Sequence, residues 1–201
     1  MKNLPLLLTI VLALLAGRSN ASHVVGAEIR YSHLQGFTYT IQGVLYSDLS
    51  SPADRPEIIM MIDGALDTIA RTSIEDQPLA GCGGLRRSIY EVEHTFPGNG
   101  TYVISFDDNF RSAGIVNIPS SVSTPICVQI KLVISDTNGS NNSIHFSQPP
   151  TSYDLSWNVI SHDPLATEVD GDELSFELIE PLGLDCAPIP SYSFPEATNF
   201  L

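Results

Sequence analysis

The stretch Phe37-Thr38-Tyr39-Thr40-Ile41-Gln42-Gly43-Val44-Leu45-Tyr46 carries the alternation that decides the fold of this chain. Successive side chains of a β-strand point to opposite faces, so residues two apart share a face. One face carries Tyr39, Ile41, Gly43 and Leu45, and the other carries Thr38, Thr40, Gln42, Val44 and Tyr46. This pattern predicts a strand with one face against a core. The Gln35-Gly36 pair before it predicts a hairpin with a strand over residues 24–31.

Further segments up to residue 135 also have the composition of strands, and Gly or Pro recurs every ten residues or so. The predicted strands are 57–62, 66–74, 87–96, 101–106 and 127–135. Asp63-Gly64 between the first two is a signal for a type I′ hairpin turn. We find no ten-residue stretch that combines helical periodicity with caps. The sequence therefore predicts an all-β fold, an Ig-like antiparallel β-sandwich over residues 22–137.

Residues 1–21 have the features of a signal peptide. Lys2 supplies a positive charge, residues 4–16 form a thirteen-residue apolar run, and Ser19-Asn20-Ala21 is a small-x-small cleavage site. An apolar run of this length is shorter than the roughly 20 residues that cross a bilayer. We expect a mature chain that starts at Ser22, has no transmembrane segment, and is secreted to the extracellular space or the cell surface.

The charge of the chain excludes several classes of partner. Removal of Lys2 and Arg18 leaves 7 basic and 23 acidic side chains, a formal charge of −16. Nucleic acids and anionic membranes attract basic surfaces, so neither is an expected partner. The acidic excess favours cations and an extracellular setting.

Residues 138–201 are predicted to hold a linker and a partial second β module. The stretch 136–146 is polar and contains Gly139, and it marks the boundary. Strands are expected at 153–159 and 174–179, on either side of an acidic turn. About 60 residues are few for a second sandwich. Together with the apolar end Phe200-Leu201, this indicates a truncated product or a fragment.

The acidic turn is the candidate metal site. Glu168, Asp170 and Asp172 stand two residues apart, and Gly171 allows the positive φ of a tight turn. Ca²⁺ takes six to eight oxygen ligands, and crowded carboxylates can supply them. Asp136 and Asn138 at the module boundary add further oxygen donors. The alternatives are a solvated acidic turn and a loop of Asx turns.

The three cysteines are Cys82, Cys127 and Cys186. We predict a Cys82–Cys127 disulfide because both residues fall in the first module, and three free thiols are the alternative. A nucleophilic Cys82 with His94 or His145 as base has no supporting pattern.

Two other patterns are considered for a function. Asp107 and Asp108 could serve as the carboxylate pair of a glycoside hydrolase. They are adjacent, however, so on a strand they point to opposite faces, and we read them as part of a loop or as further oxygen ligands. Tyr31, Tyr39, Tyr46 and Trp157 are predicted to lie in the core or on a sheet face, and a sugar-stacking role for them is the alternative.

Several segments, in order along the chain, resemble the start of large secreted surface proteins of the Bacteroidetes that are described as gliding-motility-associated. They are 21–31, 39–48, 111–118, 142–150 and 163–176. The resemblance implies Ig-like or cadherin-like modules, adhesion or gliding as the role, and calcium at the Asp170-Gly171-Asp172 turn. The chain departs from the family at His33, Leu49 and Leu155, where cysteines are common, and at Glu168, where aspartate is usual.

These observations together predict a non-enzymatic, adhesin-like surface module that is stiffened by Ca²⁺ at the junction of its two modules. Surface glycans and other surface proteins are the expected partners. A carbohydrate-binding module of a secreted protein is the alternative.

Overall fold

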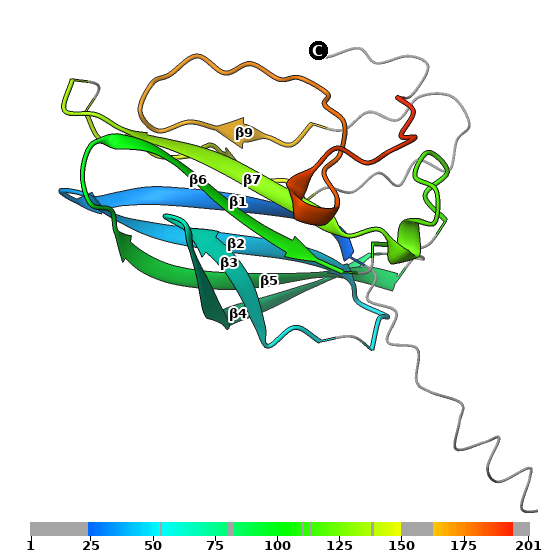
Figure 1. Ribbon diagram of the computed structural model, residues 1–201. Coiled ribbons are helices and arrows are strands. Elements are labelled where there is room, and N and C mark those ends of the chain that lie inside the picture. The colour runs from blue at the N-terminus through cyan, green and yellow to red at the C-terminus, as the bar shows by residue number, and fades with distance from the viewer. Residues whose placement is uncertain are drawn as a thin grey trace, which may run out of the picture.

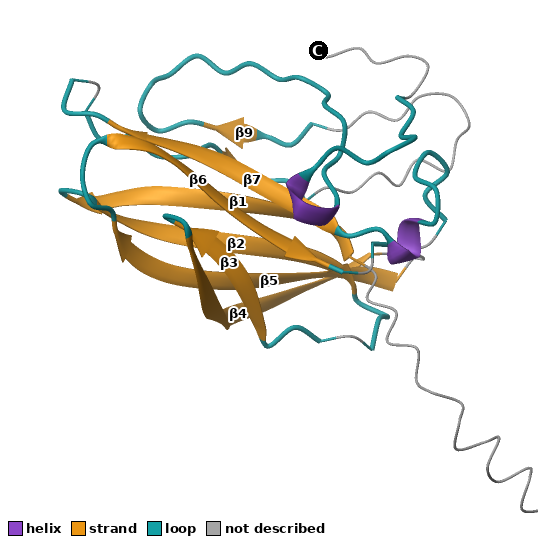
Figure 2. Ribbon diagram, viewed as in Figure 1, coloured by secondary structure: helices purple, strands orange, loops and turns teal. Residues whose placement is uncertain are grey.

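The computed structural model describes residues 24–52, 54–79, 83–109, 111–112, 114–137, 139–149 and 163–194, and the strands dominate them (Figures 1 and 2). The long strands are β1 (Val24–Gln35), β2 (Thr38–Asp48), β3 (Glu57–Ile62), β4 (Ala65–Leu79), β5 (Gly83–Thr95), β6 (Gly100–Asp108) and β7 (Ile126–Ile134). The short elements are the strands β8 (His145–Phe146) and β9 (Ala166–Thr167) and the 3-10 turns η1 (Ser121–Ser123) and η2 (Leu184–Cys186). The predicted all-β class is confirmed.

The long strands form one antiparallel sheet in the order β1-β2-β5-β4-β3-β6-β7. The strand β4 pairs with β3 through residue 70 and with β5 from Arg71 onward, with a register shift between Arg71 and Ser73. A strand that changes partner at a bulge lets a sheet turn a corner. The sheet therefore folds over on itself and encloses one core. Its two end strands, β1 and β7, lie alongside each other with some Cα atoms within 8 Å (Figure 1).

The core lies between the two halves of the folded sheet. Strand β3 shows why, since its buried and exposed residues alternate over its whole length. The face of β2 that carries Tyr39, Ile41, Gly43 and Leu45 is buried, and Val44 and Tyr46 of its other face are buried as well. A Cβ added to Gly43 would lie 2.7 Å from Ile58 Cδ1, so the halves approach closely at this glycine. The fully buried apolar side chains come from both halves and include Ile41, Met60, Ile62, Ile104 and Leu132.

The turn at Asp63-Gly64 has the predicted type I′ character, with φ values of 49° and 78°. The strand predicted at 174–179 is wrong. This segment has no strand partner in the described part of the chain, and most of its residues are exposed, including Phe176 at 50%. Alternation alone does not make a strand, because the backbone groups also need a neighbour to bond with. The strand predicted at 153–159 lies outside the described residues.

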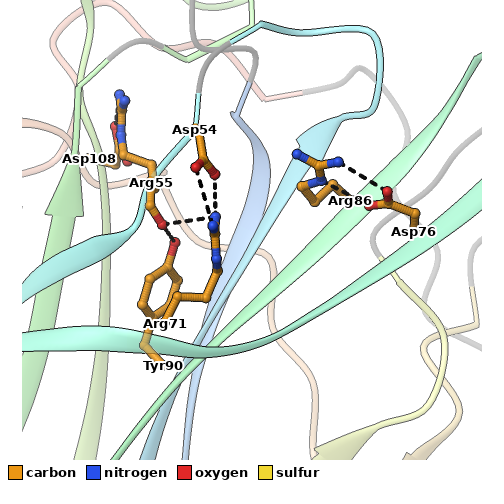
Figure 3. A network of polar contacts seen from close by, with 7 residues as sticks. All are labelled: Asp54, Arg55, Arg71, Asp76, Arg86, Tyr90 and Asp108. Atoms are coloured by element: carbon orange, nitrogen blue, oxygen red, sulfur yellow. Dashed lines mark hydrogen bonds and ion pairs between the residues drawn. The ribbon is translucent and has the colours of Figure 1, made fainter.

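A polar network fixes the chain between β2 and β3 against the corner of the sheet (Figure 3). Arg55 donates two hydrogen bonds to the buried carboxylate of Asp108, at 2.8 and 3.1 Å. The Arg55 carbonyl accepts from the Tyr90 hydroxyl at 2.7 Å and from the Arg71 guanidinium at 3.1 Å. Arg71 also pairs with Asp54. These contacts join the segment before β3 to β4, β5 and β6 where the sheet bends.

Candidate functional site

The acidic turn is organised by one carboxylate. Glu168 accepts hydrogen bonds from the backbone amides of Asp170, Gly171 and Asp172, at 2.7, 2.5 and 2.8 Å. These amides lower the pKa of the Glu168 carboxyl, the one to Asp170 most strongly. Gly171 has φ of 89°, as the sequence predicts. Glu168 therefore closes its own turn.

Asp170 connects this turn to the rest of the fold. Its carboxylate accepts from the backbone amide of Asn142 at 2.6 Å and from the Asn142 side chain at 2.8 Å. The side-chain oxygen Oδ1 of Asn142 in turn accepts a hydrogen bond from the His33 backbone amide at 2.9 Å. Ser143 and Tyr31 exchange two further hydrogen bonds, each 2.9 Å long. A continuous set of hydrogen bonds thus runs from the acidic turn to the outer edge of β1.

Several of the predicted metal ligands have hydrogen-bond partners within the chain. Asp136 accepts a hydrogen bond from the Asn99 side chain at 2.7 Å, and Asn138 lies outside the described residues. Within the part of the chain that the structure describes, no three Asp, Glu, His or Cys side chains gather closely enough to hold a metal ion. Glu168, Asp170 and Asp172 share a turn, but the first two already serve as acceptors for amides.

A disulfide holds the C-terminal part of the chain, residues 139–149 and 163–189, on β7. It lies at the other end of the seam, which is the space between the end strands β1 and β7. Cys127 of β7 is bonded to Cys186 of η2, with their Cα atoms 5.2 Å apart. The predicted Cys82–Cys127 pairing is wrong, and Cys82 lies outside the described residues. That pairing follows from the expected module boundary, which places Cys186 in a different module from Cys127. In the structure, the Cys127 amide donates to the Leu182 carbonyl at 3.1 Å, and this contact brings η2 onto β7.

Arg111 stabilises the contact between the start of β7 and the segment around Leu182. Its guanidinium donates to the carbonyls of Pro125 and Leu182, at 3.0 and 2.8 Å, and its Nε has no partner among the described residues. Burial lowers the pKa of Arg111. Sequence reasoning missed this residue, because an isolated arginine gives no sign of the carbonyls that it will meet.

The short strand β8 is hydrogen-bonded to a charged pair on β1, in which Arg30 is buried and Glu28 is half-buried. Arg30 donates to Glu28 at 2.6 Å and to the Phe146 carbonyl at 2.9 Å. The Tyr46 hydroxyl also donates to Glu28, at 2.7 Å. Burial and this carboxylate raise the pKa of Tyr46. The pair therefore connects β2 and β8 through β1.

A groove of about 710 Å³ lies along the seam between β1 and β7. Its apolar lining comes from both end strands and from the C-terminal part, and includes Ile29, Val128, Ile130, Leu174 and Ile179. Its carboxylates are Glu28, Glu168, Asp172, Glu173 and Glu180, against the cations Arg111 and Lys131. This groove is the candidate binding site.

The residues considered for sugar stacking or catalysis do not form an exposed aromatic platform or a convergent carboxylate pair in the described part of the chain. Tyr31, Tyr39 and Tyr46 are buried, so they offer no exposed platform, and Trp157 lies outside the described residues. Asp107 is exposed and Asp108 is buried at the end of β6. The two therefore point to opposite faces as predicted, although they belong to a strand and not to a loop.

The fold and the site define an all-β module whose C-terminal part is fastened across the seam between its end strands. No family model matches the chain, and no curated protein or solved structure matches it either. Among the described residues, no helix has the length and apolar character to cross a membrane.

Proposed function

We propose that this chain is an exported, non-enzymatic β-sandwich module of an adhesin-like cell-surface protein, with a role in adhesion or gliding. The observation that carries the proposal is the double fastening of residues 139–149 and 163–189 across the seam. At one end the fastening is the Cys127–Cys186 disulfide, and at the other it is the set of hydrogen bonds through Asp170 and Asn142. Disulfides persist in oxidising compartments, in agreement with export by residues 1–21.

The fastening suits a protein that bears force. Strands β1 and β7 are the ends of the sheet, and no ladder pairs them directly. A pull that separates them acts on the C-terminal part in series, through its hydrogen bonds to Tyr31 and His33 on β1 and its bonds to Cys127 on β7. The covalent bond keeps the C-terminal part on β7, so the hydrogen bonds to β1 set the resistance. The module therefore resists opening at the seam through those hydrogen bonds.

Calcium is a separate proposal. Three of the roughly four acceptor positions of the Glu168 carboxylate are already taken by amides. Asp170 gives two of its positions to Asn142, so the turn has few oxygen positions left. We propose that any Ca²⁺ binding at Asp170 and Asp172 is weak, near the millimolar range of extracellular modules. The fastening itself does not depend on it.

The proposed function is tested by locating the chain in its own cells. We expect an intact chain to lose residues 1–21, to be degraded by protease added outside the cells, and to carry the Cys127–Cys186 bond. Deletion of the gene is expected to reduce attachment or gliding. A chain without residues 1–21 serves as the control and should remain inside. Recovery of the intact chain from the cytoplasm with reduced thiols would contradict the proposal.

A further inference from the structure

We propose that the groove between β1 and β7 binds an extended, basic peptide segment of a partner protein, which adds as a strand to the outer edge of β7. The inference rests on the proposed function, because it names the kind of partner that such a surface module would hold. It follows from the backbone groups, the apolar lining and the charges of the groove.

The backbone of β7 offers free hydrogen-bonding groups. Residues two apart on an antiparallel strand direct their N–H and C=O groups to the same side. Cys127 donates its N–H to Leu182, away from β6, and the register with β6 runs without a shift along β7. The N–H and C=O groups of Gln129 and Lys131 therefore also point away from β6. They have no backbone partner among the described residues.

The opposite side of the groove is already partly paired. On β1, Tyr31 and His33 bond to Ser143 and Asn142. Ala27 and Ile29, the inner residues of that edge, have no backbone partner on this side in the described part of the chain. The unpaired stretch of β7 is adjacent to this edge across the groove. A strand added to β7 lies about 4.8 Å from it, so it fits in the part of the seam that the groove opens and not where Cα atoms of β1 and β7 approach within 8 Å.

The size and lining of the groove fit a short strand. Its volume of about 710 Å³ falls within the range of roughly 300–1,000 Å³ that is usual for ligand sites. Ile29, Val128 and Ile130 give an apolar floor, and Leu174 and Ile179 border it. Every second side chain of a bound strand would face this floor, so the partner should carry apolar residues at alternate positions.

The charges select a basic partner. Asp172, Glu173 and Glu180 line the groove and are exposed, and of them none forms an ion pair within the described residues. Lys131 is the exposed cation of the same lining. Lysine or arginine on the outward face of the peptide would meet these carboxylates. A second copy of this chain is a poor occupant, because each exported copy carries 7 basic against 23 acidic side chains, a net charge of −16.

The test uses the full exported chain and a fluorescent, acetylated and amidated peptide, Thr-Lys-Val-Lys-Val-Lys-Val-Thr, in an anisotropy titration. We expect saturable binding that weakens as salt is raised, because salt screens the charge contacts. A peptide with glutamate in place of lysine should not bind. A peptide N-methylated at alternate residues keeps its side chains but loses strand hydrogen bonds, and it should not bind either.

Variants of the protein locate the binding. Glu173→Lys together with Glu180→Lys should weaken binding by about tenfold, from two exposed charge contacts. The matched control, Glu57→Lys with Asp67→Lys, changes two exposed acids outside the groove and should leave affinity unchanged.

A backbone variant tests the strand addition. Gln129→Pro removes one outward N–H of β7 and no ladder bond to β6, so it should abolish binding, whereas Gln129→Ala should retain it. If Gln129→Pro does not fold, the N-methylated peptide still decides the question.

Four results overturn the inference: no binding, equal binding of the glutamate peptide, retained binding of the N-methylated peptide, or equal loss in the control variant. Displacement of the peptide by self-association of the chain, seen in sedimentation, also overturns it. A chain that is exported and supports attachment but binds no peptide contradicts this inference alone. A chain that binds peptide but stays in the cytoplasm contradicts the proposed function.

Discussion

Removal of the Cys127–Cys186 bond should cost this protein much of its stability. The bond joins residues 59 apart in sequence. In the chain-entropy model, a loop of this size restricts the unfolded chain enough to stabilise the fold by about 4 kcal/mol. For a domain of this length, each kcal/mol moves the melting temperature by about 2–4 °C. The expected loss is therefore about 8–16 °C.

The assay compares urea unfolding of Cys82→Ser with that of the double variant Cys82→Ser and Cys186→Ser, so that no wrong pairing can form. The single variant should match the wild-type chain, because the structure pairs Cys127 with Cys186. The double variant should unfold at lower urea, and with a larger m-value, since its unfolded state is less compact. A difference below about 1 kcal/mol would show that the bond does not constrain the chain as the entropy model requires. A large loss in Cys82→Ser alone would refute the pairing itself.

Three further predictions concern charges. Asp108→Ala leaves Arg55 half-buried without its partner and should cost about 3–5 kcal/mol in urea unfolding, while a cost under 1 kcal/mol would mean the pair is solvated. The hydrogen bond from Arg71 lowers the pKa of Asp54 below its ordinary 3.8. The stabilisation that the Asp54 carboxylate gives to the fold is therefore complete above that pH and is lost as the pH falls through the folded pKa. Asp54→Asn should flatten this part of the stability–pH curve, and an unchanged curve would count against the pair. Millimolar Ca²⁺ should raise the melting temperature relative to EDTA in the wild-type chain but not in Asp170→Ala, and an equal response of both would place any calcium elsewhere.

Local signals predicted the first part of the fold well. The alternation of β2 and the Asp63-Gly64 turn depend on neighbours in sequence, and both are confirmed. The buried face of β2 follows from the same alternation. The burial of Tyr46 on the opposite face does not follow from the alternation, because Tyr46 contacts Glu28 on another strand.

The site was less accessible to sequence reasoning, because its parts come from distant segments. Asp170 and Asn142 lie 28 residues apart, and Arg111 and Leu182 lie 71 residues apart. No local pattern indicates either contact. The acidic turn was found from its composition, yet its carboxylates bond to amides of the chain itself. The cysteine pairing failed because the predicted module boundary separated two residues that the β7 edge brings together.

The same bond has a consequence for limited proteolysis. A cut anywhere between residues 128 and 185 would fall inside the loop that Cys127 and Cys186 close. The two pieces would remain one species on a non-reducing gel and would separate only after reduction. A secreted chain nicked by proteases in its surroundings would thus keep its C-terminal piece attached. Migration as one species on a non-reducing gel is therefore no proof of an intact backbone for this protein.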